Sequence, residues 1–317
     1  METINKLMNA YQTKVVGQEE LRLALVVALI AEGHVLLESL PGLAKTLAAK
    51  TLAEATNGSF SRIQCTPDLL PSDIIGTQIY NYSKGTFDTK IGPVSANFVL
   101  HDEINRSSAK TQSAMLEAMQ ERQVSVGGVM FHMPDPFIVF ATQNPIEQEG
   151  TYELPEAQLD RFLLKVLVPY PKRDEELKIL DYTLSGQTTE PLPDSAKVSL
   201  EEIKQLQNAA KSVKVDDSIK NYITNIVAAT RDAKTVIGPE LAKYVDYGVS
   251  PRGAIALLRV AQVLALLHNR NYVTPDDVKE LRYPVLRHRI MLNFEAAADE
   301  VHSEAIIDAI FSKIIAP

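Results

Sequence analysis

A short segment near the N-terminus, Ser39-Leu40-Pro41-Gly42-Leu43-Ala44-Lys45-Thr46, has the residue types and the order of a phosphate-binding loop. It follows an apolar run at 35–37 and opens a helix-like segment that continues to Ala55. In such an arrangement, backbone N–H groups and the helix dipole hold an anion, a lysine reaches the β- and γ-phosphates, and a hydroxyl coordinates Mg²⁺. Lys45 and Thr46 occupy those positions, whereas Ser39 and Ala44 stand where the full pattern has glycine. The segment predicts a phosphate site with a relaxed loop.

A second motif is the apolar stretch 97–101, which ends in the two carboxylates Asp102 and Glu103. At the carboxyl end of a strand, Asp102 can hold Mg²⁺ through water, and Glu103 can orient and deprotonate an attacking water. The pair therefore indicates hydrolysis by a water that attacks a γ-phosphate. The alternative is that two acidic residues simply end a strand at the surface.

A third strand-like stretch, 137–142, leads to Gln143-Asn144-Pro145, where the proline prevents an immediate helix. The neutral amide of Asn144 can hydrogen-bond both a γ-phosphate and the attacking water. An asparagine that starts a turn is the alternative. The same edge of a parallel sheet collects all three motifs, which favours the catalytic interpretation.

Together these motifs resemble those of an AAA+ ATPase, and specifically of the MoxR family. The resemblance covers nearly the whole chain, and the departures from it are Ser39, Ala44 and His101, which replaces a small residue before the acidic pair. The similar segments are the adenine-side loop (Val16-Gly17-Gln18), Walker A (39–46), Walker B with the following Asn-Arg (102–106), sensor 1 (141–145), and the runs 112–122 and 143–152.

The resemblance implies ATP and Mg²⁺ as cofactors, and it implies binding and catalytic roles for individual residues. It implies nucleotide contacts from Val16, Gly17, Pro41, Gly42, Leu43, Ala44, Lys45, Thr46, Leu47 and Arg252, metal contacts from Thr46 and Asp102, and catalytic roles for Glu103, Asn144 and Arg161.

Arg252 also stands out on physical grounds. Ser250-Pro251 signals a helix start, which places Arg252 in a first turn where a cation opposes the helix dipole. A negative group should compensate, and a nucleotide phosphate would do so; this residue matches the family's sensor 2. A surface arginine paired to a carboxylate is the alternative.

Arg161 closes a short predicted helix just before the last core strand, a position that resembles the family's arginine finger. Such a residue reaches the γ-phosphate bound by a neighbouring subunit. We favour this role because the predicted site otherwise shows few cations, although a cation at a helix C-terminus is favourable by itself. Arg106 is a weaker candidate for work between subunits.

The composition of the 317 residues, 45% hydrophobic and 23% charged, predicts a large core and two domains. The single cysteine, Cys65, predicted to lie in the core, and the lack of a signal-like segment suit the cytoplasm. The apolar run 23–31 is too short to cross a bilayer and predicts a core helix. A net charge of -8 argues against a general nucleic-acid surface. The six histidines show no metal-ligand spacing.

The predicted fold class is α/β: an AAA+ P-loop core with a parallel sheet flanked by helices, followed by a smaller all-α lid. Residues 1–184 form the predicted core, 185–197 a linker, and 198–317 the lid, where the periodicity is helical throughout. Two insertions interrupt the core near 76–93 and 123–133, and Gly127-Gly128 predicts a hairpin in the second. In the family such insertions face the pore of a ring; decorative surface hairpins are the alternative. The predicted strands span 34–38, 59–64, 96–101, 137–142 and 163–168.

The sequence thus predicts a Mg²⁺-dependent ATPase. The resemblance implies a homo-oligomeric ring, expected to be a hexamer, that remodels or matures partner proteins, often with a protein bearing a von Willebrand factor A domain, without membrane insertion. Two other classes stay open: a nucleic-acid motor or loader, which the acidic charge disfavours, and a non-hydrolysing nucleotide-dependent scaffold, which Glu103 disfavours.

Overall fold

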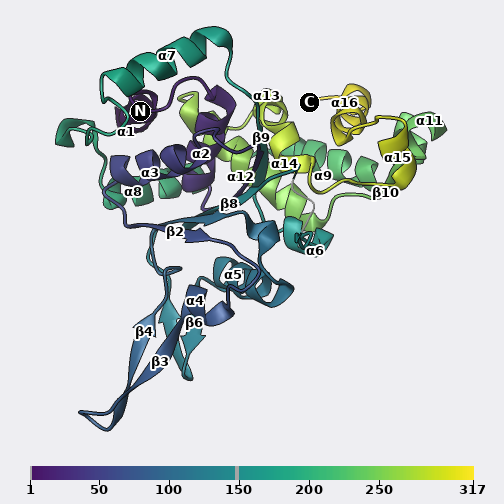
Figure 1. Cartoon of the computed structure of the whole chain (residues 1–317). Coiled ribbons are helices and arrows are strands. Elements are labelled where there is room, and N and C mark those ends of the chain that lie inside the picture. The colour runs from purple at the N-terminus through teal and green to yellow at the C-terminus, as the bar shows by residue number, and fades with distance from the viewer. Residues whose placement is uncertain (1, 147–149) are drawn as a thin grey trace. The chain divides into compact units, whose positions relative to one another are not determined.

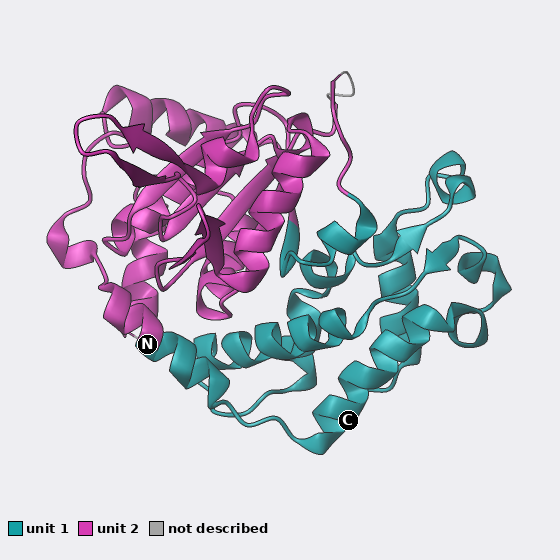
Figure 2. Cartoon of the chain, turned by 90° about the horizontal axis from the view of Figure 1, so that it is seen from below, with its two compact units in different colours: residues 1, 155–165, 205–317 teal, residues 2–154, 166–204 magenta. Residues whose placement is uncertain are grey.

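The structure is a computed structural model that describes residues 2–146 and 150–317; Glu147, Gln148 and Glu149 of the family-like run 143–152 lie outside the described residues. Two compact units are distinguished in Figure 2. We call residues 2–154 and 166–204 the core unit, and residues 155–165 and 205–317 the helical unit. The short segment 155–165 thus belongs with the C-terminal part of the chain, and the predicted domain boundaries stay a prediction.

The core unit is built on a sheet of the order β2-β5-β8-β1-β9, and Figure 1 shows α3 and α5 on opposite sides of it. The pairs that join β2, β5, β8 and β1 are all parallel. The residues of β5 are buried because helices cover both faces of the sheet. The predicted fold class is confirmed. The strands are β1 (Val35–Ser39), β2 (Phe60–Gln64), β5 (Phe98–Asp102), β8 (Ile138–Gln143) and β9 (Leu164–Val168), each within two residues of its predicted bounds.

Helices of the core unit carry the apolar faces that cover the sheet. Residues 23–30 of the apolar run 23–31 lie in α2, and Ala31 is its C-cap; residues from Ala24 to Ile30 are almost completely buried, so the prediction of a core helix is confirmed. No helix in the described part of the chain is both long and apolar enough to span a membrane. The helices are α1 (Glu2–Gln12), α2 (Glu19–Ile30), α3 (Lys45–Ala55), α4 (Pro71–Ile75), α5 (Ala109–Glu121) and α7 (Arg173–Leu184), with 3-10 turns η1 (Ile104–Arg106) and η2 (Asp194–Ala196).

Both insertions are antiparallel hairpins, and Figure 1 shows them together at one end of the core unit. The first pairs β3 (Gly76–Asn81) with β4 (Thr86–Ile91), and the second pairs β6 (Gln123–Val126) with β7 (Val129–His132). The hairpin predicted from Gly127-Gly128 is confirmed: both glycines have positive φ, of 58° and 82°, as a tight two-residue turn requires. A Cβ at Gly127 would lie 2.0 Å from the side chain of Gln78, so the two hairpins touch.

The helical unit matches the predicted lid in being mostly helical. Thr274 and Asp277 form a capping box, with Pro275 at the first helical position. Two very short strands, β10 (Val245–Tyr247) and β11 (Met291–Leu292), pair antiparallel, which the helical periodicity did not predict. The helices are α6 (Glu156–Leu159), α8 (Leu200–Lys211, which begins in the core unit), α9 (Asp217–Arg231), α10 (Ala233–Ile237), α11 (Pro239–Ala242), α12 (Pro251–Leu267), α13 (Pro275–Glu280), α14 (Arg282–Leu286), α15 (Phe294–Ala298) and α16 (Ser303–Lys313).

Candidate active site

The predicted phosphate loop connects β1 to the N-terminus of α3. Gly42 has φ 83°, and a Cβ there would meet no atom within 4 Å, so the left-handed backbone rather than a lack of space calls for glycine. Ala44 has φ 55°, a left-handed conformation that is strained for alanine. The replacement of the expected glycine by Ala44 therefore costs backbone strain at this position.

The start of α3 can accept an anion. Among the described residues, no side chain caps the first turn of this 11-residue helix, which leaves its N–H groups to an external acceptor. Lys45 is the first residue of α3, and its Nζ donates to the backbone oxygen of Ser39 across 3.4 Å. Thr46 follows in the same turn. The donor set fits a polyphosphate with Mg²⁺.

The acidic pair lies where β5 ends. Asp102 is the last residue of the strand, and Glu103 has φ 58°, so the backbone turns sharply between them. Thr142 on the neighbouring β8 donates its hydroxyl hydrogen to Asp102 Oδ1 (2.7 Å) and accepts the N–H of Glu103 (2.8 Å). The buried Thr142 thus fixes both residues, a role that sequence reasoning missed.

Asn144 follows β8, which lies between β1 and β5 in the sheet. Its Oδ1 accepts the N–H of Ile146 (3.3 Å), the turn contact that the alternative interpretation predicts. Its Nδ2 is buried and has no hydrogen-bond partner within the described residues. A buried amide donor without an acceptor is costly, so this nitrogen suits a ligand oxygen or a water held by one.

Side chains from β2 and the turn after β5 contact both acids, and the sequence did not identify them in this role. Arg62 donates to Asp102 Oδ2 from Nε (3.1 Å) and from Nη2 (2.6 Å). Gln64 Nε2 and Arg106 Nη1 both donate to Glu103 Oε2, at 2.9 and 3.1 Å. The premise that the site otherwise shows few cations was therefore wrong, because tertiary pairing brings two arginines to the acids.

A pocket beside the phosphate loop lies within the core unit. It is mostly apolar at its walls, which suits a flat base attached to a phosphate chain. Gly17 lies at the edge of this region with φ 65°, and a Cβ there would lie 2.4 Å from Glu175 of α7. Of the predicted nucleotide contacts, Val16, Gly42, Leu43, Ala44 and Leu47 line the pocket, joined by Lys14, Val15, Gln18, Pro171, Ile179, Tyr182 and Thr188.

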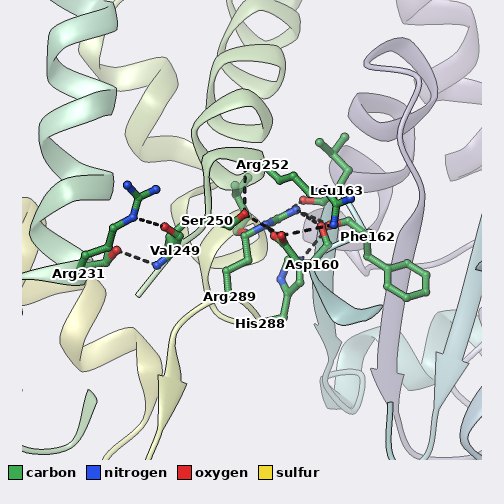
Figure 3. Close-up of polar contacts among 11 residues, drawn as sticks. Asp160, Phe162, Leu163, Arg231, Val249, Ser250, Arg252, His288 and Arg289 are labelled. Atoms are coloured by element: carbon green, nitrogen blue, oxygen red, sulfur yellow. Dashed lines mark hydrogen bonds and ion pairs between the residues drawn. The ribbon is translucent and has the colours of Figure 1, made fainter. Parts of the chain in front are cut away.

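In the helical unit, Asp160 is the centre of a polar network (Figure 3). The guanidinium of Arg289, only 3% exposed, donates Nε to Asp160 Oδ1 at 2.9 Å and donates to the backbone oxygens of Phe162 and Leu163. Burial lowers the pKa of Arg289 to about 10, still far above neutral. Ser250, the N-cap of α12, donates to Asp160 Oδ2 at 2.7 Å. This network fixes the backbone around Arg161.

The two predicted arginines of the helical unit, Arg161 and Arg252, are both close to Asp160, the first in the chain and the second in space. Arg161 follows α6, and its N–H donates to Gln158, so its place at the end of a short helix is confirmed. Arg252 is in the first turn of α12, as predicted, and its Nη1 lies 3.9 Å from Asp160 Oδ2. The compensating negative group in the described structure is thus a carboxylate, as the alternative interpretation expects. The roles of finger and sensor stay predictions.

Two further predictions concern cysteine and histidine. Cys65 is fully buried, as predicted, and burial raises the pKa of its thiol to about 12. His268, with Asp277 and Glu280, forms a group whose potential ligand atoms lie within 4.8 Å of one another, a proximity that the sequence spacing did not indicate. Asp277 is already saturated by Arg270, at 2.6 Å and 2.7 Å, so the group is an ion-pair cluster.

Comparison with known proteins agrees with this geometry. Residues 34–164 match the ATPase family associated with various cellular activities (AAA), and residues 241–310 match the AAA lid domain. Chaperone MoxR1 of Mycobacterium tuberculosis is 46% identical over 319 residues, which cover 100% of this chain and 83% of that protein. This chain belongs to the MoxR family of AAA+ ATPases.

Other similar proteins also match nearly the whole length of this MoxR-family chain. YeaC of Bacillus subtilis, described as uncharacterized, is 46% identical over 100% of this chain and 93% of its own length. Protein MoxR of Methylorubrum extorquens is 28% identical over 96% and 92%. A crystal structure of an ATPase candidate from Cytophaga hutchinsonii has a TM-score of 0.92 and 44% identity, and covers 100% of this chain and 95% of its own. The AAA match includes both acids, Asn144 and Arg161, and the lid match includes Arg252.

Proposed function

We propose that this MoxR-family protein hydrolyses ATP in a Mg²⁺-dependent reaction and uses the cycle to remodel partner proteins. The observation that carries the proposal is the order of three adjacent strands, β5, β8 and β1. Their carboxyl ends present Asp102 and Glu103, Asn144, and the phosphate loop at one edge of the sheet.

Each residue of this edge has a chemical task in the proposed reaction. The first turn of α3 and Lys45 hold the phosphates, while Thr46 and Asp102 would hold Mg²⁺, which when bound neutralises charge on the phosphate oxygens. Glu103 orients the attacking water and accepts its proton. The buried Nδ2 of Asn144, which has no hydrogen-bond partner in the described residues, suits the water or a phosphate oxygen. The pocket between Val16 and Leu47 takes the base.

The proposed assembly is a homo-oligomeric ring, with a hexamer as the expected form. Arg161 would act on the nucleotide of a neighbouring subunit, and Arg252 would contact phosphate as sensor 2. Support comes from the buried Arg289, which binds the residues directly before and after Arg161, Asp160 and Phe162, and so holds the backbone on both sides of Arg161. The proposed compartment is the cytoplasm, which suits the buried free thiol of Cys65.

The two hairpins are the proposed contact surface for a remodelled protein. The first carries exposed aromatic side chains: Tyr82 is 90% exposed and Phe87 is 63% exposed, and both rings pack edge-on against Tyr80. Clustered exposed aromatic residues are typical of protein-binding surfaces. A chaperone role, as in the name of the Mycobacterium relative, fits this surface. The proposed partner is a protein bearing a von Willebrand factor A domain.

A nucleic-acid motor is the less favoured function, because the net charge of -8 opposes binding to phosphate backbones. A non-hydrolysing scaffold is also less favoured, since Glu103 is held beside Asp102 at the phosphate edge. Stimulation of turnover by DNA, or binding of ATP without any turnover, would favour one or the other.

Calorimetry with ATP tests the nucleotide site. Lys45→Ala should lose tight binding, because it removes the cation that faces the β- and γ-phosphates. Lys50→Ala is the matched control, since Lys50 is an exposed lysine further along the same helix. Equal ATP affinity in the Lys45→Ala and Lys50→Ala proteins would show that this loop is not the nucleotide site.

A further inference from the structure

Arg62 is placed on the acid pair by the register of β2 against β5. The two strands pair in parallel, with Gln64 opposite Asp102 and Arg62 opposite Leu100. Residues 62 and 64 share one face of the strand, while the buried Ile63 points to the other. Arg62 and Gln64 therefore reach the same pair of carboxylates from the edge strand of the sheet.

The carboxylate of Asp102 has donors on both oxygens. Thr142 donates to Oδ1, and two nitrogens of Arg62 donate to Oδ2. The Asp102 side chain is 10% exposed, whereas that of Arg62 is 48% exposed. Thr142 is thus a fixed partner inside the sheet, and Arg62 is a partner that can leave toward solvent. Ion pairs with one half-exposed side chain are weak enough to be exchanged.

The same guanidinium determines which way Gln64 points. Arg62 Nη2 donates to Gln64 Oε1 at 2.5 Å, so the amide nitrogen of Gln64 faces Glu103 and donates to Oε2 at 2.9 Å. With the amide reversed, a donor would face the guanidinium and an acceptor would face the carboxylate. One arginine therefore holds Asp102 directly and Glu103 through Gln64.

We propose that Arg62 is a positioning residue that competes with the divalent cation for Asp102 and so sets the cation concentration at which nucleotide is held. The inference rests on the proposed function, in which Asp102 is the metal-holding carboxylate. Asp102 Oδ2 is the oxygen that the half-exposed Arg62 contacts, and a carboxylate oxygen suits Mg²⁺. A cation drawn to Oδ2 displaces the guanidinium of Arg62, which also removes the group that orients Gln64 toward Glu103.

The test measures Mn²⁺ binding by electron paramagnetic resonance at saturating ADP, a state without turnover. Arg62→Ala should bind Mn²⁺ more tightly than the wild-type protein, by up to about fivefold, because the competing cation is gone. Lys84→Ala, which removes one exposed charge from the β3–β4 turn, should match the wild-type protein. A merely structural role of Arg62 would weaken Mn²⁺ binding or leave it unchanged, and either result overturns the proposal.

Two further variants keep the outcomes distinct. If Arg62→Ala does not fold, Arg62→Met replaces it: the unbranched apolar side chain keeps much of the volume of Arg62 but carries no cation that competes for Asp102, so Mn²⁺ affinity should still rise, and a wild-type affinity overturns the proposal. Asp102→Asn should abolish the tight Mn²⁺ site. If Asp102→Asn keeps that site, the metal role of Asp102 fails, and with it the proposed function. If Asp102→Asn loses the site while the Arg62 variants bind as the wild type does, only the inference about Arg62 fails.

Discussion

Thr142 donates its hydroxyl hydrogen to Asp102 across 2.7 Å, and this bond joins the buried ends of two parallel strands. The same oxygen accepts the N–H of Glu103, so one side chain links both acids to β8. The acid pair is therefore positioned by the strand that also carries Asn144.

Thr142→Val tests this link. The valine has nearly the same shape but leaves Asp102 Oδ1 without its donor and the N–H of Glu103 without its acceptor. A buried hydrogen bond to a charged group contributes about 1.5–3 kcal/mol, so the free energy of unfolding should fall by about that amount in urea titrations. Thr142→Ser, which keeps the hydroxyl, should lose markedly less. Wild-type stability in Thr142→Val together with a loss in Thr142→Ser would mean that the methyl group and not the hydroxyl matters.

Substitutions at Ala44 and Gly42, two residues of the phosphate loop, should change the free energy of unfolding in opposite directions. Both have positive φ, and a left-handed residue other than glycine costs about 1–2 kcal/mol. Ala44→Gly should therefore raise the free energy of unfolding by about 1 kcal/mol, and Gly42→Ala should lower it by a similar amount, since a Cβ at Gly42 meets no atom. Thermal unfolding of both variants measures the two changes. Changes of the same sign would contradict the observed loop conformation.

Much of the candidate site at the carboxyl ends of β5, β8 and β1 was predictable from the sequence. Each of its three motifs ends or follows an apolar run, and the carboxyl ends of parallel strands meet at one edge of the sheet. The contacts of Arg62 and Gln64 were not predictable. The strand 60–64 has a weak burial pattern, and its side chains reach the acids only because the strand pairs with β5. Local sequence around Arg62 carries no sign of the carboxylate at Asp102, some 40 positions away.

The helical unit also contains a contact that the local sequence could not predict. Arg252 was located correctly by the Ser250-Pro251 helix start, but its carboxylate partner Asp160 lies 90 or more positions earlier and could not be seen. The strands β10 and β11 are three and two residues long, too short to produce an alternating pattern. In each case the missing information is tertiary pairing rather than local preference.

Acid should destabilise the protein through His34, which is buried. Its Nδ1 accepts the N–H of Val139, so Nε2 carries the proton and donates to the oxygen of Met119; burial lowers its pKa to about 4. The unfolded state binds the proton near pH 6.5 and the folded state near pH 4, so this contribution to stability is complete above pH 6.5 and falls by about 1.4 kcal/mol per unit as pH drops toward 4.

His34→Gln checks that contribution, since the amide can both donate and accept without titrating. Urea titrations between pH 7 and pH 4 should show a shallower loss of stability in this variant than in the wild-type protein. The control is His132→Gln, at an exposed position on β7, which should leave the slope unchanged. A wild-type slope in His34→Gln would contradict the neutral state assigned to His34.

The proposed role of Arg161 can be tested by mixing two variant proteins, because that role exists only between subunits. Arg161→Ala should bind ATP normally yet lose about a thousandfold in turnover, the scale of a trans arginine finger. Combined with Glu103→Gln protein, it should regain activity, since some interfaces then join an intact Glu103 to an intact Arg161. Verified coassembly without any recovered activity would assign Arg161 to a structural role.

Glu103 carries the central claim, that this edge of the sheet hydrolyses ATP. The measurement is release of phosphate, together with the identity of the bound nucleotide, after incubation with Mg²⁺ and ATP. Glu103→Gln should retain intact ATP and release phosphate about a hundredfold or more slowly than the wild-type protein, because the base that activates water is gone. Phosphate release by Glu103→Gln at the wild-type rate would contradict the account.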